Sequence, residues 1–241
     1  MNSDERLAAV IAQIAAAGSA ENRAGMSRYG INTETAYGVS VRDLRRMARH
    51  LGTDHGLALA LWGTGNHEAR ILASMVDEPS LVTPQQMDDW AAEFDSWDVC
   101  DQVTSNLFDR TPWAYDKVHL WSADEREWVK RAAFSTAAAL AVHDKTAADE
   151  RFLEILELVR GAAGDGRNFV KKAVSWALRN IGKRNRRLHA AALETATAVL
   201  ATAEALAVAD PGDPAARSAR WVARDALREL RSERVVDRLK G

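Results

Sequence analysis

The chain has few of the residues that cross-link or interrupt a fold. Its 241 residues include one cysteine, five prolines and fourteen glycines. A lone Cys100 excludes a disulfide framework and any zinc site built from several cysteines, and we expect it to be a small core residue. So few helix-breaking residues in an alanine-rich chain favour helix throughout.

Long hydrophobic runs are also absent. A membrane-spanning helix needs about 18 or more consecutive apolar residues, and the sequence contains no such stretch. The polar start, residues 1–6, is not followed by the apolar segment of a signal peptide. We therefore predict a cytoplasmic protein that does not enter a membrane.

No segment alternates cleanly between apolar and polar residues, as a half-buried strand would. Helical spacing and capping residues instead predict helices over residues 3–17, from 40 to about 51, 57–62, 67–76, 84–94, from 97 to about 111, 113–121, 124–142, 147–160, 168–182, 188–208 and 215–239. Ser3 and Ser40 are expected to cap the first two helices, and Thr83 to start a helix with Pro84 at its first position. Helix pairs recur about every 35–45 residues, which is typical of helical-repeat proteins. The prediction is an all-α solenoid of stacked antiparallel helix pairs, forming one domain over residues 1–241.

The formal net charge of -2 indicates no class of partner, but the charges are unevenly distributed. Six acidic and no basic residues lie between Asp88 and Asp101, and eight basic and no acidic residues lie between Arg167 and Arg187. The basic segment is typical of a surface that binds polyanions. A solvated helix face is the alternative interpretation.

Trp97 and Asp101 lie at positions i and i+4, so a helix places them on one face. An indole beside a carboxylate suits a flat cationic ligand, because both groups attract positive charge. The alternative is that Trp97 belongs to the core and the acidic residues to a solvated face.

A second aromatic residue lies within the basic segment. Trp176 precedes Arg179 by three residues, and Lys183 follows Arg179 by four, so a helix brings the three side chains to one face. Cations that neutralise phosphates, next to an aromatic side chain, are typical of nucleic-acid surfaces. Trp221, by contrast, falls on an apolar face and is expected in the core.

Several segments, in order, resemble the bacterial DNA alkylation repair family of HEAT-like alkylpurine DNA glycosylases. The similarity runs from about residue 20 to residue 190 and lies mainly in residues 37–39, 67–70, 95–101, 128–132 and 169–179. The resemblance implies a C-shaped all-helical solenoid that binds duplex DNA and excises N3- or N7-alkylated purines. We expect it to act as a monomer without a cofactor or metal.

The resemblance also assigns roles by motif. Trp97 and Asp101 match the family's aromatic residue and catalytic carboxylate, Arg131 matches an arginine of the next inner helix, and Trp176 matches a second tryptophan. The matching DNA contacts are Arg179, Lys183, Lys130, Lys172 and, more loosely, Tyr29. Other residues of these motifs have structural readings: we expect Glu68 and Arg70 to form an ion pair or cap, and His67 a surface or cap role.

The chemistry agrees with these roles. An N-alkylated purine is cationic and leaves readily, while the sugar becomes oxocarbenium-like. A carboxylate at Asp101 would stabilise that cation and orient water, and no lysine is needed for a Schiff base. The sequence therefore predicts a monofunctional glycosylase. A non-catalytic helical-repeat module that binds DNA or protein is the alternative.

Overall fold

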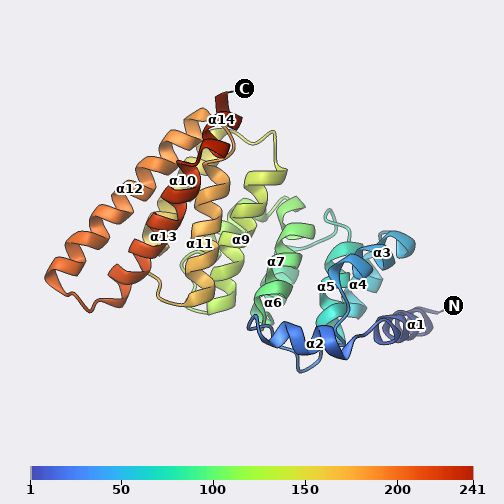
Figure 1. The fold of residues 1–241 in the computed structure, drawn as a ribbon. Helices are drawn as coiled ribbons and strands as arrows, with labels where there is room; N and C mark the ends of the chain where they lie inside the picture. The colour runs from blue at the N-terminus through green and yellow to red at the C-terminus, as the bar shows by residue number, and fades with distance from the viewer. Residues whose placement is uncertain (1, 241) are drawn as a thin grey trace. The chain divides into compact units, whose positions relative to one another are not determined.

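The computed structural model describes residues 2–240, and side chains as far as Leu239. Within these residues there are fourteen α-helices, one short 3-10 helix and no strand (Figure 1). This confirms the predicted all-α class. The chain divides into two compact units, Met1–Pro112 and Trp113–Gly241. The prediction of one domain over residues 1–241 concerns how these units are related, and it stays a prediction.

The first unit contains seven α-helices and the 3-10 helix. They are α1 (Ser3–Ala16), α2 (Ala20–Ser27), α3 (Val41–Leu51), α4 (His55–Gly63), α5 (His67–Val76), α6 (Pro84–Ala92), α7 (Trp97–Asn106) and η1 (Phe108–Arg110). Short polar side chains start most of them by accepting a backbone N–H from the first turn. Ser40 does this for α3, Asn66 for α5 and Thr83 for α6, where Pro84 takes the first helical position.

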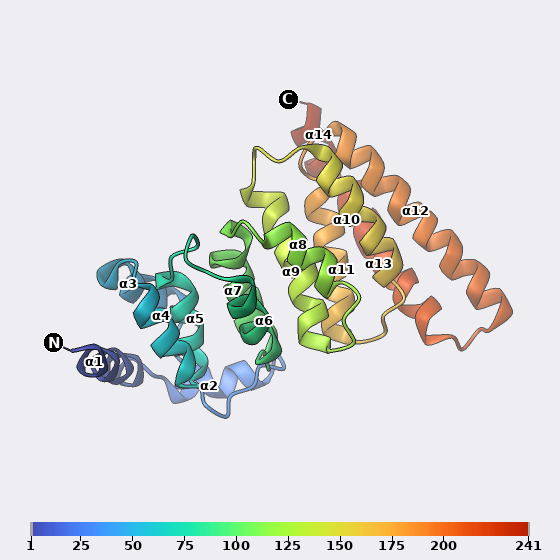
Figure 2. The ribbon, with the colours of Figure 1, turned by 180° about the vertical axis from the view of Figure 1, so that it is seen from behind.

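The second unit contains α8 (Ala114–Trp121), α9 (Glu127–His143), α10 (Asp149–Ala162), α11 (Asn168–Ile181), α12 (Arg186–Ala209), α13 (Pro214–Leu230) and α14 (Glu233–Lys240). The helices α9, α11 and α13 pack side by side in one layer, and α8, α10 and α12 form the other (Figures 1 and 2). Consecutive helices therefore alternate between the two layers and form antiparallel pairs, as predicted for helical repeats.

Alanine allows the helices of the second unit to approach closely. Every residue from Arg131 to Ala141 in α9 is buried, and six of these eleven are alanines. At the end of α11, a side chain at Gly182 would bring a Cβ within 2.7 Å of Leu230 and 2.8 Å of Ala192. The crossing of α11 with α12 and α13 thus requires glycine at this position.

Four boundaries differ from the sequence predictions. The N-cap of α1 is Asn2 rather than Ser3, with a reciprocal bond to Glu5. Residues 20–27 form a helix that was not predicted, and α7 ends at Asn106, where η1 follows. The helix predicted over 215–239 is broken at Arg231 and Ser232, whose N–H groups return to the carbonyls of α13.

By length and composition alone, helix α12 is long and apolar enough to span a membrane. That is weak support for a membrane helix, because helices in the cores of water-soluble proteins meet the same criterion. Here α12 packs along α13 and α10. Its buried residues are Leu188, Ala192, Thr195, Ala196, Val199 and Ala203.

Candidate functional site

The N-terminal half of α7 presents the predicted tryptophan and aspartate. The helix begins at Trp97, so Asp101 lies one turn later on the same face, and both side chains are half-buried. Cys100 between them is fully buried, as predicted. The predicted arrangement of an indole beside a carboxylate is therefore present at the surface of the first unit.

The segment that follows α2 is held against the start of α7. The indole Nε1–H of Trp97 donates to the Tyr29 carbonyl oxygen at 3.0 Å. The Asn32 side-chain amide donates to Asp95 at 2.7 Å, and the Asn32 backbone N–H donates to the Ser96 hydroxyl at 3.4 Å. The structure thus brings Tyr29, whose side chain is 74% exposed, to the site of Trp97 and Asp101.

A buried carboxylate fixes the loop between α2 and α3. Glu68 is fully buried and accepts the backbone N–H groups of Tyr37, Gly38 and Val39 at 2.7 to 3.1 Å. Gly38 has φ of 83° there, and a Cβ at this position would lie 2.2 Å from the Ser19 carbonyl oxygen. Only glycine fits this conformation and this contact.

Glu68 and Arg70 form a cap and an ion pair, as expected, but not with each other. Glu68 caps the backbone of the loop, while Arg70 forms an ion pair with Glu93 at 2.5 Å and lies over the Trp62 ring. The sequence placed these side chains close together along one helix, but their partners come from other segments. Both residues are structural, as expected.

His67 and Asp98 form a second buried polar pair next to this loop. The His67 Nε2 lies 2.9 Å from Asp98, which also accepts the Ser96 hydroxyl at 2.6 Å. Burial opposes the charge on both groups, but the bond between them outweighs it, so the pKa of His67 is raised and the pKa of Asp98 is lowered. His67 is therefore not a surface residue, and Asp98 anchors α7 to α5.

Arg131 and Lys130, the predicted cations of α9, lie in the second unit. Arg131 is buried, and its Nη1 donates to the Phe169 carbonyl oxygen of α11 at 2.6 Å. Lys130 lies 3.4 Å from Asp165, in the loop before α11. Both residues thus connect α9 to α11, a structural role that the sequence did not indicate.

The predicted phosphate contacts of α11 are paired with acidic residues of α13. The Arg179 guanidinium lies 2.5 Å from Glu229 and 3.4 Å from Asp225, and the Lys183 ammonium lies 2.7 Å from Glu229. Burial acts to raise the pKa of Glu229, but the bonds from Lys183 and Arg179 dominate and lower it. Trp176 is half-buried on the same helix.

Most other cations of the basic segment are also bonded within the protein. Arg167 pairs with Asp165 at 2.5 Å, Arg187 pairs with Glu150 at 2.7 Å, and Arg184 donates to the Ala141 carbonyl oxygen. Lys172 is exposed. The segment is therefore a much weaker source of positive potential than its sequence indicates, because its partners lie outside it.

The site residues predicted from the sequence are divided between the two units. Tyr29, Trp97 and Asp101 belong to the first unit, and the second unit holds Arg131, Trp176, Arg179, Lys183, Lys130 and Lys172. Within residues 2–239, no three His, Cys, Asp or Glu side chains are grouped so that they could hold a metal ion.

The comparisons with known proteins agree with the fold class. A solved structure described as belonging to a new family of proteins related to the HEAT-like repeat DNA glycosylases, with affinity for branched DNA structures, superimposes with a TM-score of 0.71. It shares 21% sequence identity, and the match covers 79% of this chain and 82% of that one. The fold is thus that of a HEAT-like repeat protein.

The sequence itself identifies the family. Residues 10–230 match the family described as DNA alkylation repair enzyme, so the chain belongs to that family. No curated protein matches the sequence significantly.

Proposed function

We propose that the protein is a monofunctional DNA glycosylase that excises cationic N3- or N7-alkylated purines from duplex DNA, acting as a cytoplasmic monomer without a cofactor. Its family membership supports a role in DNA alkylation repair. The observation that carries the proposal is the start of α7, where Trp97 and Asp101 share a half-buried face and the Trp97 indole is bonded to the Tyr29 carbonyl oxygen.

Asp101 is the proposed catalytic carboxylate. As the bond between sugar and base breaks, positive charge develops on the sugar, and a fixed carboxylate stabilises that charge more in the transition state than in the ground state. The same carboxylate orients the attacking water. The positive charge of the alkylated base makes it a good leaving group.

Trp97 and Tyr29 are the proposed contacts for the lesion in the first unit. The face of an indole attracts a cationic ring. The hydrogen bond to the Tyr29 carbonyl oxygen fixes the indole plane, so less conformational freedom is lost when the lesion binds. The exposed Tyr29 ring offers a further aromatic surface beside it.

In the second unit we propose Trp176, Arg131 and the cations of α9 and α11 as contacts for the DNA around the lesion. Lys172 is exposed and available to phosphate, whereas Arg179, Lys183 and Lys130 would share their charge with acidic partners. Arg131 would contact phosphate in addition to its bond with Phe169. These residues are expected to contribute less to affinity than their number indicates.

The test is a single-turnover base-release assay with duplexes that contain N7-methylguanine or N3-methyladenine. The proposal expects release of both bases from duplex DNA and none of unmodified guanine, whose neutral form leaves poorly. Wild-type protein that binds these duplexes and releases neither base would contradict it.

A second candidate is a non-catalytic DNA-binding module of the same fold. The description of the similar structure, a relative of the glycosylases with affinity for branched DNA, favours it. Binding to a four-way junction and to a linear duplex of the same composition separates the two functions. Marked preference for the junction, together with no base release, would favour this candidate.

A further inference from the structure

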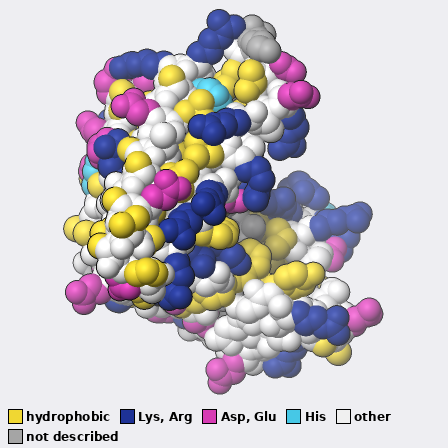
Figure 3. Space-filling view, turned by 60° about the vertical axis from the view of Figure 1, so that its left-hand side comes forward, with side chains coloured by type: hydrophobic (Ala, Val, Ile, Leu, Met, Phe, Trp, Pro, Cys, Tyr) yellow, Lys and Arg dark blue, Asp and Glu magenta, His cyan; other side chains and the backbone are white. Residues whose placement is uncertain are grey.

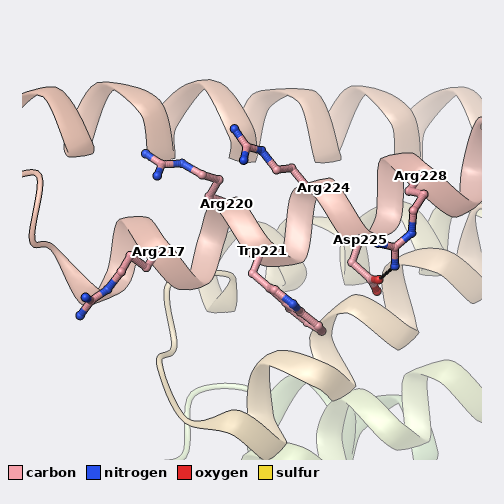
Figure 4. Close-up of a pocket in the computed structure, with 6 residues that line it drawn as sticks. All are labelled: Arg217, Arg220, Trp221, Arg224, Asp225 and Arg228. Atoms are coloured by element: carbon pink, nitrogen blue, oxygen red, sulfur yellow. Dashed lines mark hydrogen bonds and ion pairs between the residues drawn. The ribbon is translucent and has the colours of Figure 1, made fainter.

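The outer face of α13 carries a row of arginines that the sequence analysis did not assign. Arg217, Arg220, Trp221, Arg224 and Arg228, which we call the α13 stripe, line a shallow depression of about 340 Å³ together with Asp225 (Figure 4). Figure 3 shows lysine and arginine side chains gathered on the face of the second unit that is turned to the viewer.

Helix geometry explains why these residues form a stripe. The arginines follow one another at intervals of three or four residues, which keeps them on one side of a helix. In Figure 4, Arg220 and Arg224 extend from one side of α13 and Trp221 from the other. At about 1.5 Å per residue, the distance along the helix from Arg217 to Arg228 is about 16 Å.

Two of the four arginines of the stripe have no carboxylate partner in the part of the chain that the structure describes. Asp225 and Glu229 are turned to α11, where they neutralise Arg179 and Lys183. Within the described residues, no carboxylate pairs with Arg217 or Arg220, and the buried Nε of Arg220 has no hydrogen-bond partner. The positive charge that the sequence predicted on α11 is thus found on α13.

Arg224 and Arg228, the two arginines of the stripe that have carboxylate partners, are only weakly held. Arg224 lies 4.0 Å from Glu204, and both side chains are more than half exposed. Arg228 is 79% exposed and pairs with Asp225, which already accepts from α11. Exposed pairs of this kind contribute little and exchange readily for another anion.

Trp221 adds an aromatic surface to the stripe. It was predicted to lie in the core, but it is 38% exposed, and the Lys171 ammonium of α11 lies over its ring, 5.4 Å from the ring centre. An exposed indole among arginines offers an apolar contact to sugars beside cations that bind phosphate.

We propose that the α13 stripe binds the phosphate backbone of duplex DNA, an inference that rests on the proposed function because it takes DNA as the partner. One DNA strand carries a phosphate about every 3.4 Å along the helix axis, so the stripe spans the axial length of about five phosphates. Arginine forks bind such oxygens bidentately.

The test compares two double variants with the same change in net charge. The first, R217Q/R224Q, removes two arginines of the stripe and leaves Arg220, whose Nε is buried, in place. The control, R151Q/R160Q, removes two exposed arginines of α10, which lie outside the basic segment. Circular dichroism and thermal melting confirm that both variants fold.

The measured quantity is the slope of log affinity against log salt concentration for an undamaged duplex. Each lost phosphate contact reduces this slope by about 0.9, so R217Q/R224Q should reduce it by about 2, while R151Q/R160Q leaves it unchanged. An unchanged slope for R217Q/R224Q, with normal wild-type binding, would overturn the inference and leave the proposed function intact. It would point to an acidic protein as the partner of the stripe. Wild-type protein that does not bind duplex DNA would overturn both.

Discussion

The candidate residues of α7 and α11 were predicted from the same spacing rule, but the two helices differ in what lies beside those residues. Each supplies a pair of functional candidates four residues apart: Trp97 and Asp101 lie on α7, whereas Arg179 lies on α11 and Lys183 two residues past its end. On α7 the neighbouring segment is bonded to the indole and leaves both candidates half-exposed. On α11 both cations meet Glu229, some fifty residues further along the chain. Spacing predicts which residues share a face, whereas the charge of that face depends on the helix packed beside it.

The loop between α2 and α3 depends on the buried carboxylate of Glu68. We expect the largest loss of stability when the charge of this carboxylate is removed. Glu68→Gln removes a charge that accepts three backbone N–H groups. Hydrogen bonds to charged groups are strong, so the free energy of unfolding should fall by about 3 kcal/mol. Urea unfolding measures it, with Glu21→Gln on the exposed surface of α2 as the control. Equal midpoints for the two variants would show that Glu68 does not hold the loop.

The buried pair of His67 and Asp98, which joins α5 to α7, makes the stability of the protein depend on pH. Because the pKa of His67 is raised above its ordinary 6.5, the stabilisation is complete below that pH and is lost as the pH rises through the raised value. The lowered pKa of Asp98 keeps this carboxylate ionised well into acid.

Asp98→Asn should therefore destabilise the protein by about 2 kcal/mol near pH 5.5 and by much less near pH 9. Thermal or urea unfolding across this range provides the measurement. A difference from wild type that does not vary between these two pH values would contradict the charged pair.

The hydrogen bond from the Trp97 indole to the Tyr29 carbonyl oxygen joins α7 to the segment that follows α2. Trp97→Phe keeps a ring but removes the indole N–H, and the loss of one hydrogen bond should cost about 1 kcal/mol. The backbone amides of residues 28–33 should then exchange with deuterium faster. Trp113→Phe, which changes an exposed tryptophan of the second unit, serves as the control. Unaltered exchange would mean that other contacts hold the segment.

The sequence predicts the features that depend on residues close together along the chain, but not those that depend on residues far apart. The helices, the face shared by Trp97 and Asp101, and the capping roles of Ser40 and Thr83 depend on neighbours within four residues, and the structure shows them as predicted. The bonds of Arg131 with Phe169 could not be predicted, because they join residues distant in sequence.

The same reason explains the two errors about charge and burial in the second unit. The neutralisation of Arg179 and Lys183 depends on the packing of α13 against α11. Trp221 was expected in the core, but it is 38% exposed, and Lys171 of the neighbouring helix lies over its ring. The break at Ser232 likewise depends on local hydrogen bonds that helical periodicity does not reveal.

The smallest effect concerns the neutralised cations of α11. Glu229→Gln releases Arg179 and Lys183 from their shared partner, so duplex DNA should bind a few-fold more tightly, with a salt slope steeper by about 1. Glu233→Gln, an exposed change of the same charge on α14, is the control. Identical slopes for the two variants would show that the α11 cations do not face DNA even when they are released.

The central claim is that Asp101 of α7 performs the chemistry, and base release by Asp101→Asn tests it most directly. Single-turnover release of N7-methylguanine from a duplex is measured for wild type, for Asp101→Asn and for Asp95→Asn. The Asp95→Asn control removes a charge two residues before Trp97 and keeps an oxygen that can accept from Asn32. We predict that Asp101→Asn lowers the release rate by about 10²-fold or more, as expected for the loss of one preorganised electrostatic group. We also predict that Asp95→Asn stays near the wild-type rate. Release by Asp101→Asn at the wild-type rate would contradict the account.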